Sequence, residues 1–81
     1  MGFTEHTKLR KEKFGTVLFD TLTEKIFITD QVGTHILEFI AKGMESSEIV
    51  NQLCDIFDGD KQIIEKDTME FIAELKLNNM L

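Results

Sequence analysis

The sequence predicts a small α+β domain in which a β-hairpin leads into three helices. Two short apolar runs, residues 16–20 and 25–29, are separated by four residues, and a helical spacing of apolar side chains follows at once. Residues 8–14 alternate weakly and are the one further strand candidate, which gives three strands. With so few strands, the outer edge of residues 25–29 is expected to have no neighbour and to be free for docking.

The hairpin loop determines which residues face one another. Its four residues set four pairs opposite each other: Asp20 and Lys25, Phe19 and Ile26, Leu18 and Phe27, and Val17 and Ile28. Strand alternation then divides these side chains between two faces. We expect the helices to pack against the continuous apolar face of Val17, Phe19, Ile26 and Ile28. Leu18 and Phe27 fall on the other face, among polar neighbours.

The three helices are bounded by recognisable capping residues. Asp30 stands where the N-cap of the first helix belongs, and Gly43 follows its last apolar positions. The second helix begins at Ser46, a good capping residue, and Asp58-Gly59-Asp60 marks its end. The third helix is expected over roughly residues 60–78, after which the last residues pack back onto the core.

Length and charge limit the classes of function. The 81 residues allow a single domain, which we place at residues 8–81 after a flexible arm at residues 1–7 that lacks periodicity. The net charge of -6 disfavours binding to nucleic acid or to an anionic membrane. Against this average, Lys8, Arg10, Lys11 and Lys13 gather four of the nine basic residues. This segment is either a solvated strand or a docking site for an acidic partner.

The sequence predicts a cytoplasmic protein that is not an enzyme. Cys54 is a lone cysteine, no run of residues is long and apolar enough to span a bilayer, and no signal peptide is apparent. His6 lies in the predicted arm, His35 is expected at the surface, and Cys54 is expected in the core. No spacing suits a metal, and no glycine-rich loop suits a phosphate, so we expect no catalytic residue, metal or cofactor.

The order of these elements resembles a PqqD-like domain, also called a RiPP recognition element, where RiPP denotes a ribosomally made and then modified peptide. The resemblance runs over about residues 8–81. Its residues are Gly15-Thr-Val-Leu-Phe-Asp20, Thr29-Asp30, Gly33, Ile36, Leu37, Lys42-Gly43, Ser47-Glu-Ile-Val50, Leu53, Asp67-Thr-Met-Glu-Phe71-Ile72, Leu75 and Met80-Leu81. No single motif is specific, and the ordered pattern carries the likeness. Thr29-Asp30, Lys42-Gly43 and Asn79 depart from the usual family residues.

The resemblance implies a winged-helix-like fold and a role as a peptide-binding adaptor. Such domains bind the leader of a precursor peptide and present it to a modifying enzyme, often a radical S-adenosylmethionine (SAM) enzyme with a SPASM extension. A free strand edge would take the leader by β-strand addition, with the last helix as the other wall. The expected peptide-binding residues are Lys25, Ile26, Phe27, Ile28, Thr29, Lys61, Ile64, Thr68 and Phe71. The same edge could pair with a second copy, so a monomer or a weak homodimer is expected.

Two other classes of protein fit the size and the pattern less well. A winged-helix transcription regulator is the main alternative, but it needs a basic recognition helix, and the last helix carries Glu65, Asp67, Glu70 and Glu74. A carrier protein is the other, but it presents an attachment serine in an Asp-Ser-Leu motif. The nearest segment here is Glu45-Ser-Ser-Glu48, and a helical carrier has no hairpin.

Overall fold

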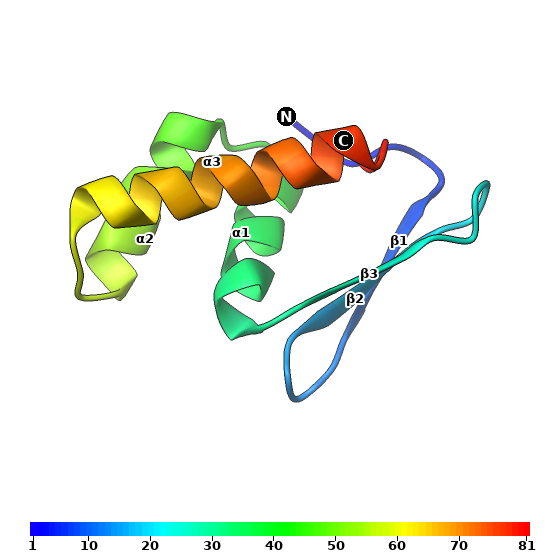
Figure 1. Cartoon of the computed structure of the whole chain (residues 1–81), viewed down its shortest axis with the longest axis horizontal. Helices are drawn as coiled ribbons and strands as arrows, with labels where there is room; N and C mark the ends of the chain where they lie inside the picture. Colours follow the sequence, from blue (N-terminus) through cyan, green and yellow to red (C-terminus); the bar gives the residue numbers. More distant parts are fainter.

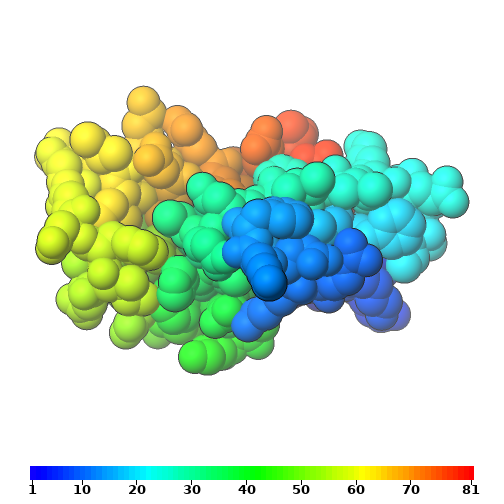
Figure 2. Space-filling model, turned by 90° about the horizontal axis from the view of Figure 1, so that it is seen from below, coloured from blue at the N-terminus to red at the C-terminus, as the bar shows by residue number.

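The structure, a computed structural model, describes residues 1–81 as a three-stranded sheet followed by three helices (Figure 1). The elements are β1 (Thr7–Lys11), β2 (Thr16–Asp20), β3 (Ile26–Thr29), α1 (Gln31–Ala41), α2 (Ser46–Ile56) and α3 (Lys61–Leu77). The strands are antiparallel in the order β1-β2-β3, so β2 is central and β3 lies at an edge. The predicted α+β class, with three strands before three helices, is confirmed. In the space-filling view of Figure 2, the sheet lies at one end of the molecule and α2 at the other.

The hairpin register is as predicted, but its two faces are reversed. Phe19 pairs with Ile26 and Val17 with Ile28, as the loop length requires. The central Leu18 is nevertheless fully buried in the core, whereas Ile26 is 62% exposed and Ile28 is 64% exposed. The prediction that the helices pack against the face of Ile26 and Ile28 is therefore wrong. The helices cover the opposite face, to which Leu18 and Phe27 belong.

The reversal arises because the polar residues beside Leu18 have hydrogen-bond partners inside the fold. Thr16 is buried with its hydroxyl 2.8 Å from that of Thr34 on α1. Asp20 is buried as well, and its carboxylate accepts a hydrogen bond of 2.8 Å from the Leu22 amide. That hydrogen bond is the main cause that holds the pKa of Asp20 below its ordinary value. These hydrogen bonds lower the cost of burying Thr16 and Asp20, although Oδ2 of Asp20 is buried without a partner. Counting apolar side chains alone therefore misassigns the inner face.

The helix boundaries follow mostly from the predicted caps. The Asp30 carboxylate accepts a hydrogen bond of 3.0 Å from the Gly33 amide at the start of α1, and Asp60 caps α3 in the same way. Gly43 follows α1 with a φ of 83°, the left-handed conformation that glycine adopts without strain. The two aspartates therefore start helices through their side chains, and Gly43 ends α1 through its backbone conformation.

The cap of α2 differs from the prediction by one residue. Ser46 is the first helical residue, and Glu45 occupies the capping position. The Glu45 amide donates a hydrogen bond of 3.3 Å to the Glu48 carboxylate, the reciprocal contact of a capping box. The Glu48 carboxylate thus gives the Glu45 amide a partner. With Ser46 as the cap, the Glu45 amide would lie before the helix and outside this contact.

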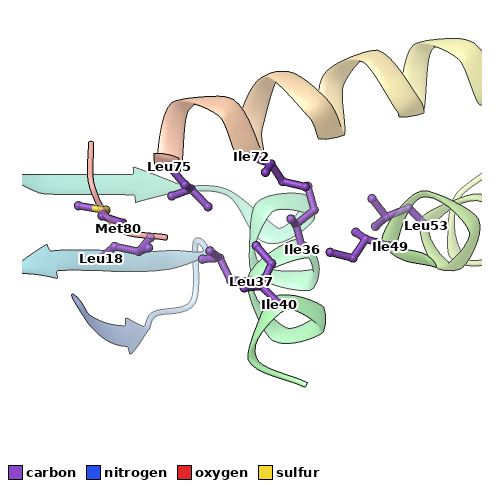
Figure 3. Packing of buried hydrophobic residues seen from close by; sticks show 9 residues of the cluster. All are labelled: Leu18, Ile36, Leu37, Ile40, Ile49, Leu53, Ile72, Leu75 and Met80. Atoms are coloured by element: carbon purple, nitrogen blue, oxygen red, sulfur yellow. The ribbon is translucent and has the colours of Figure 1, made fainter. Parts of the chain in front are cut away.

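The core lies between the inner face of the sheet and the three helices (Figure 3). Its nine buried residues are Leu18, Ile36, Leu37, Ile40, Ile49, Leu53, Ile72, Leu75 and Met80. Met80 is fully buried, which confirms that the C-terminus packs back onto the core. His35 and Cys54 are both half-buried, so neither the surface place expected for His35 nor the core place expected for Cys54 is correct. The His35 ring lies 5.5 Å from that of Phe57. Phe57, which follows the last residue of α2, covers the side of α1 that carries His35. The spacing of apolar residues along α1 did not predict that this side is covered.

The first six residues are tied to the rest of the fold at Met1 and Thr4. The Thr4 amide donates a hydrogen bond of 3.1 Å to the Met80 carbonyl, and the terminal amine lies 3.1 Å from a Glu45 carboxylate oxygen. The strand begins at Thr7, one residue before the predicted start of the domain. The predicted flexibility of residues 1–7 in solution stays a prediction.

Alanine substitutions on the two faces of the hairpin should differ strongly in their effect on stability. Leu18→Ala removes a fully buried side chain and should lower the free energy of unfolding by about 2–5 kcal/mol. Ile28→Ala trims an exposed side chain and should change it by less than about 1 kcal/mol. Urea denaturation of both variants measures this difference. Equal destabilisation, or a larger effect at Ile28, would contradict the assignment of the inner face.

Candidate functional site

The outer edge of β3 carries backbone groups that no strand of the protein uses. The Asp20 amide donates to the Lys25 carbonyl at 3.0 Å, which makes these two residues a hydrogen-bonded pair of the hairpin. In an antiparallel ladder such pairs alternate, so residues 25, 27 and 29 point their amides and carbonyls toward β2. Ile26 and Ile28 therefore point theirs away from β2, toward the free edge. No turn, loop or cap hydrogen bond reaches either residue.

Helix α3 runs beside this edge and is joined to it by an aromatic pair. Figure 3 shows β3 between β2 and α3. The Phe27 ring on β3 and the Phe71 ring on α3 meet edge to face, with centroids 5.8 Å apart and planes at 87°. The exposed backbone edge thus has an aromatic floor on its inner side. The N-terminal segment pairs with β2 at the opposite edge of the sheet, so β3 stays uncovered.

A partly enclosed hollow of about 420 Å³ lies next to the aromatic pair. Eleven residues line it: Asp30, Val32, Gly33, Ile36, Leu53, Phe57, Asp58, Ile64, Asp67, Thr68 and Phe71. Three of the predicted helix residues, Ile64, Thr68 and Phe71, are among them. Lys61 is exposed at the first position of α3 and does not line this hollow. The structure thus brings three of the four predicted helix residues together in one hollow. No residue of β3 lines it, and the Phe71 ring joins it to Phe27 of β3.

The sequence-based site left out the contribution of α1 and α2. The far wall of the hollow is formed by four residues at the start of α1 and three at and after the end of α2, namely Asp30, Val32, Gly33, Ile36, Leu53, Phe57 and Asp58. Gly33 is one signal that points there. A Cβ built on Gly33 would lie 1.6 Å from Thr29 Oγ1 and 3.0 Å from Phe71 Cε2. A glycine inside a helix, where alanine is preferred, indicates such a close approach.

The walls of this region are negatively charged. A second, open hollow along α3 is lined by Asp67, Glu70, Phe71, Ala73, Glu74 and Leu77. Asp30 and Asp58 add carboxylates to the enclosed hollow. Neither hollow has a basic side chain in its lining. A ligand that fills both therefore meets apolar and aromatic surface bordered by carboxylates, and a cationic ligand gains most from that field.

Two other features bear on what the site can hold. The structure brings no three His, Cys, Asp or Glu side chains together in an arrangement that could hold a metal ion. None of the three helices has the combined length and apolar character needed to cross a bilayer. The distinguishing feature of the molecule remains a free strand edge with an aromatic floor and an acidic wall.

The family follows from the match of the sequence to known proteins. Residues 15–81 match the family described as coenzyme PQQ synthesis protein D (PqqD). The chain belongs to the PqqD family. The match includes β2, β3 and all three helices. It therefore contains the whole candidate site, which we call the groove: the free edge of β3, the Phe27–Phe71 pair and the two hollows along α3. The family expected from the ordered residue pattern is thereby confirmed.

Relatives of this PqqD-family chain are known in sequence and in structure. A PqqA binding protein of Gluconobacter oxydans (strain 621H) is 26% identical over 81 residues, which cover all of this chain and 84% of that protein. TbiB1, solved in complex with the TbiA(β) leader peptide, superposes with a TM-score of 0.92 at 25% identity, covering 100% of this chain and 94% of TbiB1. Lasso peptide synthetase B1, complexed with its leader peptide, shares the fold with a TM-score of 0.86 at 17% identity, covering 96% and 92% of the two chains.

Proposed function

We propose that this chain captures the leader of a ribosomally made precursor peptide as a fourth strand on β3 and presents it to a modifying enzyme. The observation that carries this proposal is that the backbone amides and carbonyls of Ile26 and Ile28 point to the free edge of β3. This edge lies beside the Phe27–Phe71 pair. An extended peptide can pair with their amides and carbonyls and place alternate side chains over the floor. The chain then acts as a binding adaptor and supplies no catalytic group of its own.

The relatives support a peptide ligand. One relative is a PqqA binding protein, and TbiB1 was solved with a leader peptide. In this chain the proposed contact residues are Lys25, Ile26, Phe27, Ile28, Thr29, Ile64, Thr68 and Phe71. Lys61, which is exposed and lines neither hollow, is proposed as a further contact. Because a short added strand buries modest area and ordering the peptide costs free energy, the dissociation constant should be on the order of micromolar or below.

The partner that receives the leader is proposed to be a radical SAM enzyme. The resemblance to the PqqD family carries this part of the proposal, since the groove itself says nothing of the chemistry done on the peptide. The acidic α3 argues against the alternative of a DNA-binding regulator, because Asp67, Glu70 and Glu74 line its exposed side. The groove suits a peptide better than a phosphate backbone.

Titration of the isotope-labelled chain with the leader of the precursor from the same gene cluster tests the proposal. The amides of residues 25–29 and those around Phe71 should shift, while those on the exposed side of α2 should stay in place. A scrambled leader of equal composition is the control, and it should bind more weakly. Shifts confined to another surface would show that the leader does not use the groove.

The acidic wall should make the affinity depend on the charge of the peptide. We expect Asp67→Asn and Glu74→Gln each to weaken binding of a lysine-containing leader about two- to fivefold, as exposed ion pairs do. Glu65→Gln is the matched control, since Glu65 is exposed on the same helix but lines neither hollow. Fluorescence anisotropy at low and high salt measures the effect, which should shrink as salt rises. An equal response of all three variants would contradict a role for the wall.

A further inference from the structure

The outer face of the sheet, on the side away from the helices, is apolar and uncovered. Its residues form two rows that cross all three strands: Lys8, Phe19 and Ile26 in one row, and Arg10, Val17 and Ile28 in the other. Phe19 is 36% exposed, and the two isoleucines are more than 60% exposed. The helices pack on the opposite face, to which Leu18 and Phe27 belong. An exposed apolar surface on β2 and β3, with basic residues of β1 at its border, indicates an interaction site.

The charge on this face is opposite to that of the chain as a whole. The net charge is -6, yet the only charged side chains in the two rows are Lys8 and Arg10. Arg10 is 76% exposed in its side chain and lies 2.7 Å from Glu12 just beyond the strand. Lys11 points to the other face, where it binds Glu38 of α1 at 2.8 Å. The basic segment is therefore divided, and only Lys8 and Arg10 border the apolar rows.

These observations select the kind of partner. Two copies of this chain stacked through this face would bring four basic side chains into one interface. The rows hold no acidic residue, and the nearby Glu12 is already paired with Arg10 of its own chain. A partner with an apolar patch bordered by carboxylates complements both the rows and their basic end. Such a surface on another protein therefore fits better than a second copy.

The position of the outer face next to the free edge of β3 indicates which partner carries the complementary acid-bordered patch. A leader added to β3 continues the sheet, so every second leader side chain lies on the outer face next to Ile26 and Ile28. A protein bound there touches the adaptor and the leader at once. We propose that the outer face, formed by Lys8, Arg10, Val17, Phe19, Ile26 and Ile28, docks the modifying enzyme through an acid-bordered apolar patch. This inference rests on the proposed leader binding.

Two substitutions on β1 and β2, away from the β3 edge, test this surface. The probe is the purified modifying enzyme of the same gene cluster, titrated against the labelled chain with its leader bound. Phe19→Thr keeps a strand-forming residue and should weaken enzyme binding about tenfold or more. Arg10→Glu should weaken it at low salt and less at high salt. Ile56→Thr, an exposed apolar residue of α2, is the matched control and should bind the enzyme as the unaltered chain does.

Leader affinity and self-association are measured for the same variants. Leader binding should stay within about twofold of the unaltered chain, because neither substitution touches the groove. The inference is overturned if both variants bind the enzyme normally, if the enzyme does not bind the unaltered chain, or if sedimentation shows a dimer that only Phe19→Thr disrupts. Failure of the unaltered chain to bind its leader would instead refute the proposed function, so the two failures are distinguishable.

Discussion

Replacing Ile28 by proline should weaken leader binding about tenfold or more while the protein stays folded. The Ile28 amide points to the free edge, because Ile28 lies in a non-hydrogen-bonded pair with Val17. Proline removes that amide hydrogen and places its ring where the leader backbone must approach. The loss combines one backbone hydrogen bond with a steric clash. No hydrogen bond between β2 and β3 is lost, because those use the neighbouring residues.

The matched control is Ile28→Ala, which trims the same side chain but keeps the amide. It should bind the leader within about threefold of the unaltered chain if backbone pairing dominates the affinity. Isothermal titration of both variants gives the comparison, and circular dichroism shows whether the fold survives. Equal affinities for the proline and alanine variants would mean that the leader does not pair with this edge.

Replacing Gly33 by alanine should destabilise the protein by about 1–3 kcal/mol, the reverse of the usual effect in a helix. An alanine inside a helix is normally better than glycine by about 0.5–1 kcal/mol. Here the new Cβ would lie 1.6 Å from Thr29 Oγ1 and 3.0 Å from Phe71 Cε2. Because both neighbours are held in the packed junction of β3 and α3, one of them must move.

The same substitution should also weaken leader binding, since Phe71 forms the floor of the groove with Phe27. Gly2→Ala is the control, because a Cβ at that position meets no atom within 4 Å. Chemical denaturation measures stability, and leader titration measures binding for each variant. A Gly33→Ala variant that is more stable than the unaltered chain would show that the junction of β3, α1 and α3 is looser than described.

Local sequence signals predicted much of the fold. The four-residue loop predicted the register of Phe19 with Ile26, and Asp30 predicted the start of α1, because each depends on neighbours along the chain. The capping residue of α2 was placed one residue late, at Ser46. Serine is a preferred cap, but the reciprocal Glu45–Glu48 contact decides the boundary.

The faces of the hairpin were not predictable by counting apolar residues. Which face is buried depends on the Thr16 hydroxyl meeting Thr34, and on the Asp20 carboxylate meeting the backbone of its own turn. The first contact joins residues from different elements, and alternation along a strand does not reveal it. The apolar face that appeared to be the core is the exposed one, which is why it becomes a candidate docking surface.

The candidate site was predicted on β3 and only in part on the helices. The small number of strands implies a free edge, so residues 25–29 could be predicted from the sequence as the edge strand. Gly33, Phe57 and Asp58 line the enclosed hollow because of how α1 and α2 pack relative to α3. Hydrophobic spacing along the sequence does not determine that packing. Lys61 was included by helical spacing, but it lies outside the lining of the enclosed hollow.

Amide hydrogen exchange on β3 tests the central claim most directly. In the free chain the amides of Ile26 and Ile28 should exchange quickly, whereas the Phe27 amide, directed at β2, should be protected. Saturating leader peptide should slow exchange at Ile26 and Ile28 and change Phe27 little. If the leader binds while the Ile26 and Ile28 amides keep exchanging at their free rates, the peptide is held without becoming a strand of the sheet, and the account is wrong.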